Sequence, residues 1–195
     1  IWFAGYGGGL YCTEDLFRTV KPFLDADGRE IYPQDIISFI CLSDYNEMYL
    51  GLEERGVAKV DLVSGTVTRL RLSDNPDAPL FVRHILPYSP EELWIGTESG
   101  IVVYNVRTRR YQHLKSSPYD PYSLSDNAVY SLCKDREGGL WIGSFFGGIN
   151  YLPQRNSDFE KYYHTDDPHS LQGRRVREIC PGSDGRLWIG TEDAG

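Results

Sequence analysis

The sequence predicts an all-β protein built from repeated four-stranded antiparallel sheets. Three observations support this prediction. An aromatic residue recurs about every 47 residues, a glycine follows each aromatic at a nearly fixed distance, and each complete period holds four short apolar runs separated by turns. The 20 glycines and 14 tyrosines agree with it, because these residue types favour turns and strands over helices.

The aromatic repeat runs through the whole chain. Its slot is occupied by Trp2, Tyr49, Trp94, Trp141 and Trp188, which are 47, 45, 47 and 47 residues apart. The surrounding letters read IWFAG, MYLGL, LWIGT, LWIGS and LWIGT. A period of about 40–50 residues is typical of solenoids, propellers and arrays.

The period around Trp141 shows how the four strands are arranged. They are expected at 129–133, 140–144, 149–152 and 159–163, with glycine-containing turns after the first two. Four antiparallel strands in about 47 residues make one blade of a β-propeller. We therefore expect residues 1–195 to form a single β-propeller segment of about four blades. The expected divisions are a partial blade at 1–24, blades at 36–72, 81–115 and 128–163, and a partial blade at 175–195.

Positions that follow the repeat are interpreted as scaffold. The aromatic side chains are expected to pack between neighbouring blades, where they bury a large apolar area. The slot two residues after the aromatic holds Gly96, Gly143 and Gly190 in the clearest copies. A glycine in a strand lets a neighbouring chain approach closely.

Three of the four cysteines share one slot, eight residues before the aromatic. They are Cys41, Cys133 and Cys180, and Leu86 occupies the slot in the remaining copy. We therefore expect these cysteines to be small, buried, unpaired hydrophobes. Because no Cys/His spacing typical of metal ligands occurs, we expect neither a metal site nor a cofactor.

Composition excludes several classes of partner. The chain carries 20 basic and 28 acidic residues, a net charge of −8, and its basic cluster at 174–177 is short. A nucleic-acid partner is therefore not expected. No apolar run approaches the roughly 18 residues of a membrane helix, so this segment is not expected to insert into a bilayer. The chain begins and ends inside the repeat, so we expect it to be an internal piece of a longer protein.

The segment 123–144, with an Asp-x-x-Gly turn at 135–138 ahead of LWIG, and the segment 170–191, which contains a second LWIG, resemble the two-component regulator propeller repeat. The earlier copies depart from its consensus at Ala4 and Tyr49. The resemblance implies a seven-bladed propeller in the periplasmic sensor region of a Bacteroides-type hybrid two-component protein. It further implies that the ligands are glycan-derived oligosaccharides and that the signal passes to a cytoplasmic histidine kinase and phosphorelay. The segment itself is not expected to be an enzyme.

Positions that depart from the repeat on one face are the candidates for ligand binding, because local rules tend to break at functional sites. That face carries the crossovers into each first strand and the turns between second and third strands. The candidates are Phe145, Phe146, Arg83, His84, Tyr130, Arg174, Arg175 and Arg177. Exposed aromatic rings can stack on the apolar faces of sugars, and guanidinium groups suit carboxylates or sulfates. A loop packed on its neighbour and a solvated basic cluster are the structural alternatives. The two histidines of 164–169 are assigned to a turn, because Asp-Pro-x-Ser-Leu recurs 47 residues apart.

Two other function classes stay open at this point. One is a propeller scaffold that binds protein partners. The other is a glycan-active enzyme, whose paired carboxylates are not apparent because Glu53, Glu54 and Glu98 fall on separate turns. The second strand is present in both end blades, so a closed four-bladed ring would have one strand too many. We therefore expect the natural domain to have more blades, and the isolated piece to self-associate through its end blades.

Overall fold

The structure is a computed structural model that describes residues 1–194 apart from 6, 16, 44–45, 76–77, 121, 155–161 and 166. The chain forms two compact units. The first consists of Ile1–Ser116 and Leu124–Gln154, and the second of Ser117–Ser123 and Arg155–Gly195.

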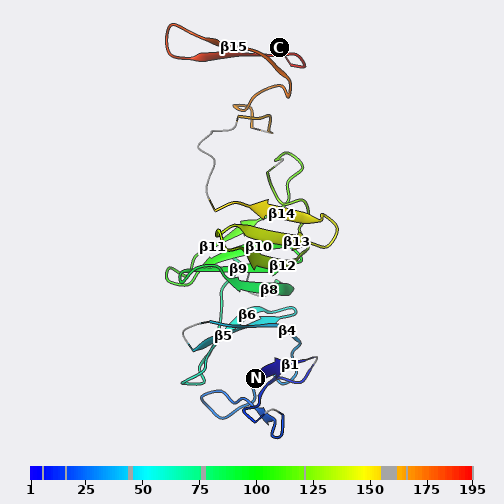
Figure 1. The fold of residues 1–195 in the computed structure, drawn as a ribbon, viewed down its shortest axis with the longest axis vertical. Helices are drawn as coiled ribbons and strands as arrows, with labels where there is room; N and C mark the ends of the chain where they lie inside the picture. The colour runs from blue at the N-terminus through cyan, green and yellow to red at the C-terminus, as the bar shows by residue number, and fades with distance from the viewer. Residues whose placement is uncertain are drawn as a thin grey trace. The chain divides into compact units, whose positions relative to one another are not determined.

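The described residues of the first unit form four antiparallel sheets, each with its strands in chain order (Figure 1). The first sheet contains β1 (Trp2–Ala4), β2 (Leu10–Cys12) and β3 (Lys21–Pro22). The second contains β4 (Ile37–Leu42), β5 (Glu47–Leu52), β6 (Gly56–Asp61) and β7 (Val67–Arg69). The third contains β8 (Val82–Pro87), β9 (Glu92–Thr97), β10 (Gly100–Asn105) and β11 (Tyr111–Leu114). The fourth contains β12 (Val129–Lys134), β13 (Leu140–Ser144) and β14 (Ile149–Leu152).

The second unit contains one antiparallel pair, β15 (Val176–Pro181) with β16 (Leu187–Thr191). Of the strand expected at 159–163, residues 159–161 lie outside the described part, and Tyr162 and Tyr163 belong to no strand. The predicted all-β class with four-stranded antiparallel sheets is confirmed, and no helix occurs in the described part of the chain. Within that part, nothing has the helical length and apolar character needed to cross a membrane.

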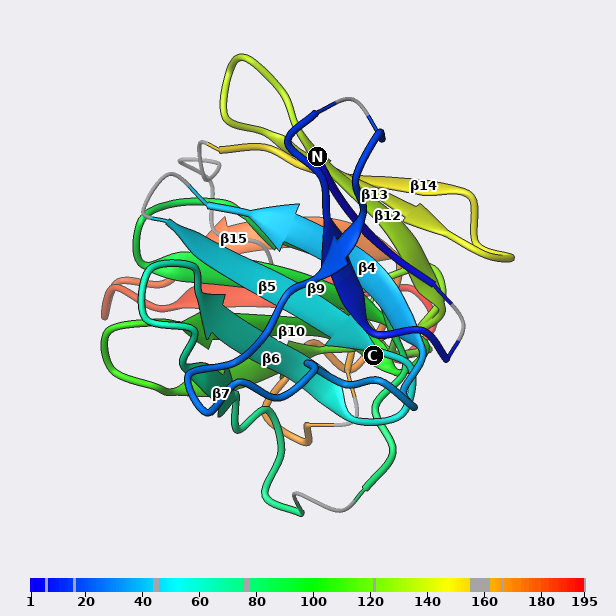
Figure 2. The same ribbon diagram turned by 90° about the horizontal axis from the view of Figure 1, so that it is seen from below.

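Successive sheets of the first unit pack face to face, with an apolar core between each pair. The aromatic slot contributes to every core: Trp2 packs against the first, Tyr49 lies in the second and Trp94 in the third. Figure 2 shows β5 and β6 of the second sheet lying across β9 and β10 of the third. The repeat therefore encodes one sheet together with the face that meets the next sheet.

The aromatic is buried only where a further sheet follows. Tyr49 and Trp94 are 4% and 7% exposed, whereas Trp141 is 45% and Trp188 is 65% exposed. The expectation of burial is wrong for the last two. No sheet of the first unit follows β12–β14, and no described sheet of the second unit follows β15–β16.

Burial in the cysteine slot also depends on whether a further sheet follows. Cys41, Cys133 and Cys180 pair directly across the strands with the aromatic of their own sheet. Cys41 is half-buried, but Cys133 and Cys180 are exposed, which corrects the expectation of burial. All four cysteines of the chain are free thiols in the structure.

Two sheets approach closely at the glycine slot. A Cβ added to Gly51 would lie 2.8 Å from Cγ1 of Val82 in the next sheet. A Cβ on Gly96 would lie 3.0 Å from Cγ1 and 3.1 Å from the carbonyl oxygen of Val129. At Gly190, by contrast, the nearest atom would be 3.8 Å away, in its own sheet. A side chain at Gly51 or Gly96 would therefore require the valine of the next sheet to shift.

This geometry predicts different effects for one substitution made in two copies of the repeat. We expect Gly96→Ala to lower the free energy of unfolding by about 1–3 kcal/mol through overpacking against Val129. The matched Gly190→Ala change should stay within about 0.5 kcal/mol, because its Cβ meets open space. Urea unfolding monitored by circular dichroism measures both variants. Equal losses in the two variants would contradict the assigned close approach.

Candidate functional site

A β-bulge recurs near the start of the first strand in four of the sheets. The register shifts lie between residues 37 and 39, 82 and 84, 129 and 131, and 176 and 178. The bulged residues are Ser38, Arg83, Tyr130 and Arg177. Bulges redirect side chains and are over-represented next to functional sites. Three of the four bulged residues belong to the candidates identified from the sequence.

A repeated backbone hydrogen bond brings a turn residue next to each bulge. The N–H of the residue four positions after the aromatic donates to the carbonyl just before the first strand. The bonds are Glu53 to Ile36 (3.0 Å), Glu98 to Phe81 (3.2 Å), Phe145 to Ala128 (2.8 Å) and Glu192 to Arg175 (2.9 Å). The bulged side chain and the turn side chain therefore emerge at the same end of each sheet.

In three of the four sheets a contact joins the side chains in these two slots, and we call each such pair a bulge–turn couple. In the third sheet, Nε of Arg83 donates to Oε1 of Glu98 at 3.0 Å, and its Nη2 also bonds that oxygen. In the second unit, Nη2 of Arg177 lies 3.1 Å from Oε1 of Glu192. In the fourth sheet the couple is aromatic, because the rings of Tyr130 and Phe145 have centroids 5.1 Å apart. The two positions recur from sheet to sheet, but the residue types that occupy them differ.

Within the first unit the couples are also joined from sheet to sheet. The Tyr130 hydroxyl donates to Oε1 of Glu98 at 3.2 Å, and the Arg83 guanidinium lies 5.3 Å from the Tyr130 ring centroid. Nη1 of Arg83 is 4.0 Å from Oε1 of Glu53 in the second sheet. The Arg83 hydrogen bonds hold the pKa of the Glu98 carboxyl below its usual value. Two carboxylates thus face one guanidinium, which leaves Arg83 no free charge for an acidic ligand.

Three aromatic side chains, Tyr130, Phe145 and Phe146, form what we call the aromatic platform. Phe145 and Phe146 are 58% and 85% exposed, and their rings meet edge to face at 4.5 Å. The backbone N–H of Phe146 donates to Oδ2 of Asp126 at 3.0 Å, which fixes the turn. Exposed apolar patches are places where binding sites are often found, so this cluster of rings is a binding candidate.

The structure places the other sequence candidates elsewhere. His84 is half-buried between sheets, where its ring packs 4.4 Å from that of Phe39, and burial lowers its pKa. Arg174, Arg175 and Arg177 belong to the second unit. The backbone N–H groups of Arg174 and Arg175 donate to the Asp193 carboxylate.

Sequence reasoning did not identify Glu53 and Glu98 as partners of Arg83. The signal is present in the repeat, because each bulged residue precedes its turn residue by the same 15 positions.

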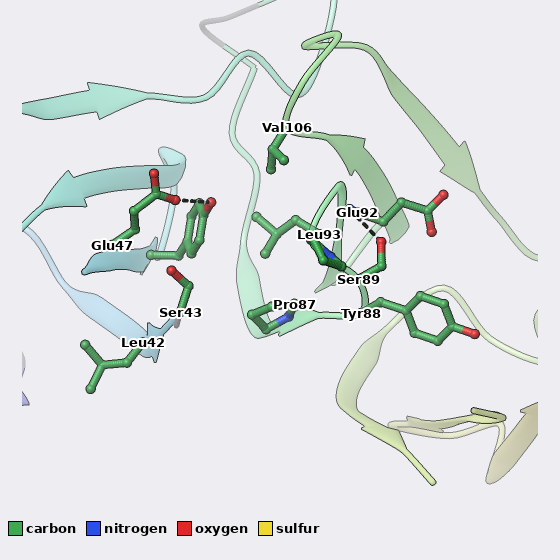
Figure 3. A pocket seen from close by; sticks show the side chains of 11 residues that line it. Leu42, Ser43, Glu47, Pro87, Tyr88, Ser89, Glu92, Leu93 and Val106 are labelled. Atoms are coloured by element: carbon green, nitrogen blue, oxygen red, sulfur yellow. Dashed lines mark hydrogen bonds between the residues drawn. The ribbon is translucent and has the colours of Figure 1, made fainter. Parts of the chain in front are cut away.

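A cavity of about 400 Å³ lies at the opposite ends of these strands, between the second and third sheets (Figure 3). Its polar groups already bond one another. The Tyr49 hydroxyl donates to Oε2 of Glu47 at 3.1 Å, and Lys59 forms an ion pair with the same carboxylate. Burial and the Glu47 charge raise the pKa of Tyr49. Ser89 accepts the N–H of Glu92 at 3.1 Å in the adjoining turn. The other lining carboxylate, Glu92, accepts the indole N–H of Trp94 at 3.4 Å.

The described residues include no group of three His, Cys, Asp or Glu side chains placed to hold a metal ion.

The Arg83–Glu98 couple predicts a specific pH dependence. The folded-state pKa of Glu98 is lowered, so the ionised carboxylate stabilises the fold. This stabilisation is fully present above the unfolded-state pKa of about 4.3 and is lost as the pH falls through the folded-state pKa. At pH 7 we expect Glu98→Gln to cost less than about 1 kcal/mol, because the pair is partly exposed. The cost should vanish in acid. Thermal unfolding from pH 7 to 3 tests this, with Glu54→Gln on the neighbouring turn as the control. A pH-independent cost of Glu98→Gln would refute the interpretation.

Comparison with known proteins identifies the repeat. Residues 123–146 and 170–193 match the two component regulator propeller family. A protein from Formosa agariphila named histidine kinase P4 is 31% identical over 169 residues, which is 83% of this chain. The chain spans only 12% of the length of that curated relative.

Two solved structures from B. thetaiotaomicron share the fold. Both are extracellular domains of proteins assigned as hybrid two-component systems. The first has a TM-score of 0.66 and 22% identity, covering 98% of this chain and 24% of the other. The second has a TM-score of 0.56 and 16% identity, covering 97% of this chain and 37% of the other. Together with the aromatic slot, the glycine slot and the stacked antiparallel sheets, these matches show that the chain carries two-component regulator propeller repeats.

Proposed function

We propose that this chain belongs to the sensor region of a hybrid two-component signalling protein. Its aromatic platform would receive an oligosaccharide outside the cytoplasm, in the periplasm, and the signal would pass to a cytoplasmic histidine kinase. The name of the curated relative and the extracellular origin of the two similar structures support this role. The kinase and its phosphorelay are part of the proposal, because the chain spans a small share of that relative.

The observation that carries the proposal is the exposure of the aromatic platform. A loop that only packs on its neighbour would bury its rings, whereas Phe145 and Phe146 stay open to solvent on a turn held by two backbone hydrogen bonds. The apolar face of a sugar ring can stack on such rings. The Glu98 carboxylate, bonded to the Tyr130 hydroxyl, stands beside them and can accept hydrogen bonds from sugar hydroxyls.

The charge around the platform favours a neutral sugar at this place. Glu53, Glu98 and Asp126 carry three negative charges against the one positive charge of Arg83. An acidic sugar would meet repulsion there, and Arg83 is already engaged by two carboxylates. A neutral oligosaccharide can replace bound water with hydrogen bonds from its own hydroxyls, and it meets no such charge repulsion.

The blade boundaries expected from the repeat are our proposal for the domain organisation. The four-stranded sheets β4–β7 and β8–β11 support them. Exposed Trp141, Ile179 and Trp188 support further blades in the natural domain, or self-association of the isolated chain.

The platform gives a direct binding test. A screen of neutral oligosaccharides on a glycan array supplies the probe, and calorimetry measures its affinity for wild type and variants. We expect Phe145→Ala combined with Phe146→Ala to weaken binding about tenfold, because two stacking surfaces are lost. Phe17→Ala is the matched control, since Phe17 is also 58% exposed but lies on another loop.

Two outcomes would count against this function. One is an equal loss in the Phe17 control and the platform variant. The other is an array on which the wild-type chain retains no oligosaccharide while binding a protein partner through the same face, which would favour an interaction scaffold.

A further inference from the structure

The second unit contains a cavity of about 360 Å³, whereas the residues of the aromatic platform belong to the first unit. Most of its lining comes from the two segments of chain that precede β12 and β15 in the sequence. The side chains that matter chemically are Tyr119, Asp120, Tyr162, Tyr163, His164 and Arg174. Cavities of this size with aromatic walls and a few polar groups are typical of small-molecule sites.

Two copies of the same turn build this part of the second unit. In the first, Oγ of Ser123 accepts the N–H of Ser117 at 2.8 Å and donates to the carbonyl of Asp120 at 2.7 Å. In the second, Oγ of Ser170 accepts the N–H of Thr165 at 3.0 Å and donates to the carbonyl of Asp167 at 2.7 Å. Each serine therefore ties its loop closed, so the lining side chains start from fixed backbone positions.

The aromatic wall is anchored but partly open. The Tyr163 hydroxyl donates to Oδ1 of Asp120 at 3.1 Å, and the ring of Tyr122 packs on that of Tyr163 at 5.6 Å. The amide N–H of Tyr122 also bonds Oδ1 of Asp120, at 2.9 Å. Both bonds use one oxygen, which leaves Oδ2 able to accept from a ligand hydroxyl. Tyr119 is 53% exposed and offers a ring face for stacking.

His164 has a defined orientation. Its Nδ1 lies 2.7 Å from the carbonyl oxygen of Leu171. A carbonyl only accepts, so Nδ1 carries the proton, and Nε2 of the neutral ring is left as an acceptor.

Arg174 differs from the two bulged arginines, Arg83 and Arg177. Arg83 and Arg177 are paired with the turn carboxylates of their own sheets. Among the described residues, no carboxylate forms an ion pair with the guanidinium of Arg174, although Asp193 bonds its backbone N–H at 3.1 Å. A guanidinium presents a planar fork of donors that matches an oxyanion. The cavity therefore combines stacking surface, hydroxyl acceptors and one uncommitted cation.

We propose that this cavity binds a sugar that bears an oxyanion group, either a carboxylate or a sulfate. Arg174 pairs with the oxyanion, the tyrosines stack on the ring, and Asp120 and His164 accept from its hydroxyls. The inference rests on the proposed sensing of saccharides and adds a second site with a different charge preference. The aromatic platform takes neutral sugar, whereas this cavity takes the acidic one.

The test titrates the 195-residue chain with galacturonic acid, galactose 6-sulfate and galactose, followed by calorimetry and NMR shifts. We expect one of the two acidic sugars to bind about tenfold more tightly than galactose, and its identity tells carboxylate from sulfate. Arg174→Gln should abolish this preference. Arg175→Gln, a change of the same charge at the next residue, which does not line the cavity, should keep it.

The inference is overturned if galactose binds as tightly as both acidic sugars, if none of the three binds, or if Arg174→Gln and Arg175→Gln behave alike. Its failure is distinguishable from failure of the proposed function. If Arg174→Gln changes nothing while neutral oligosaccharides still bind the aromatic platform, only the second site is wrong. Retained binding of those neutral probes also shows that the variant is folded.

Discussion

The close approach of successive sheets at the glycine slot is the constraint on which the first unit depends. Residues two apart on a strand point to the same face, so the aromatic and the glycine that follows it meet the next sheet together. Gly51 and Gly96 let Val82 and Val129 come within contact distance, while Tyr49 and Trp94 fill the space beside them. A large side chain next to a small residue on one face of a sheet lets two sheets pack together without voids. We therefore interpret the spacing Trp-x-Gly as a motif for packing one sheet against the next, and not as a binding motif.

Once these slots are fixed, the end of each sheet is free to vary. The bulge and the turn bring two side chains together whatever their chemistry, as the ionic couple Arg83–Glu98 and the aromatic couple Tyr130–Phe145 show. The variable pairs thus lie at the ends of the sheets, outside the apolar cores between them. Under the proposed function, substitutions at these slots would change ligand preference without disturbing those cores.

The period could be predicted from the sequence, and so could the strands of the complete repeats, apart from the one expected at 159–163. The end of the sheets that carries the variable residues could also be predicted. The sequence did not allow burial to be assigned copy by copy. Whether Trp141 or Cys133 is covered depends on a neighbouring sheet, which the local letters do not encode. The sequence makes Arg83 a ligand-binding candidate because of its place at the start of a first strand. Its two carboxylate partners come from turns 15 and 30 residues away and are brought to it by the fold.

The central claim is that the glycine slot and the valine of the next sheet act as one packing unit. A double-mutant cycle on Gly96→Ala and Val129→Ala measures this coupling most directly. If the claim holds, removing the Val129 methyl groups relieves the closer of the two contacts and leaves the one with the carbonyl oxygen. Val129→Ala should then cost less in the Gly96→Ala background by about 0.5–3 kcal/mol in the free energy of unfolding. Costs that add independently, within about 0.3 kcal/mol, would show that these two sheets are not held by contact at this slot.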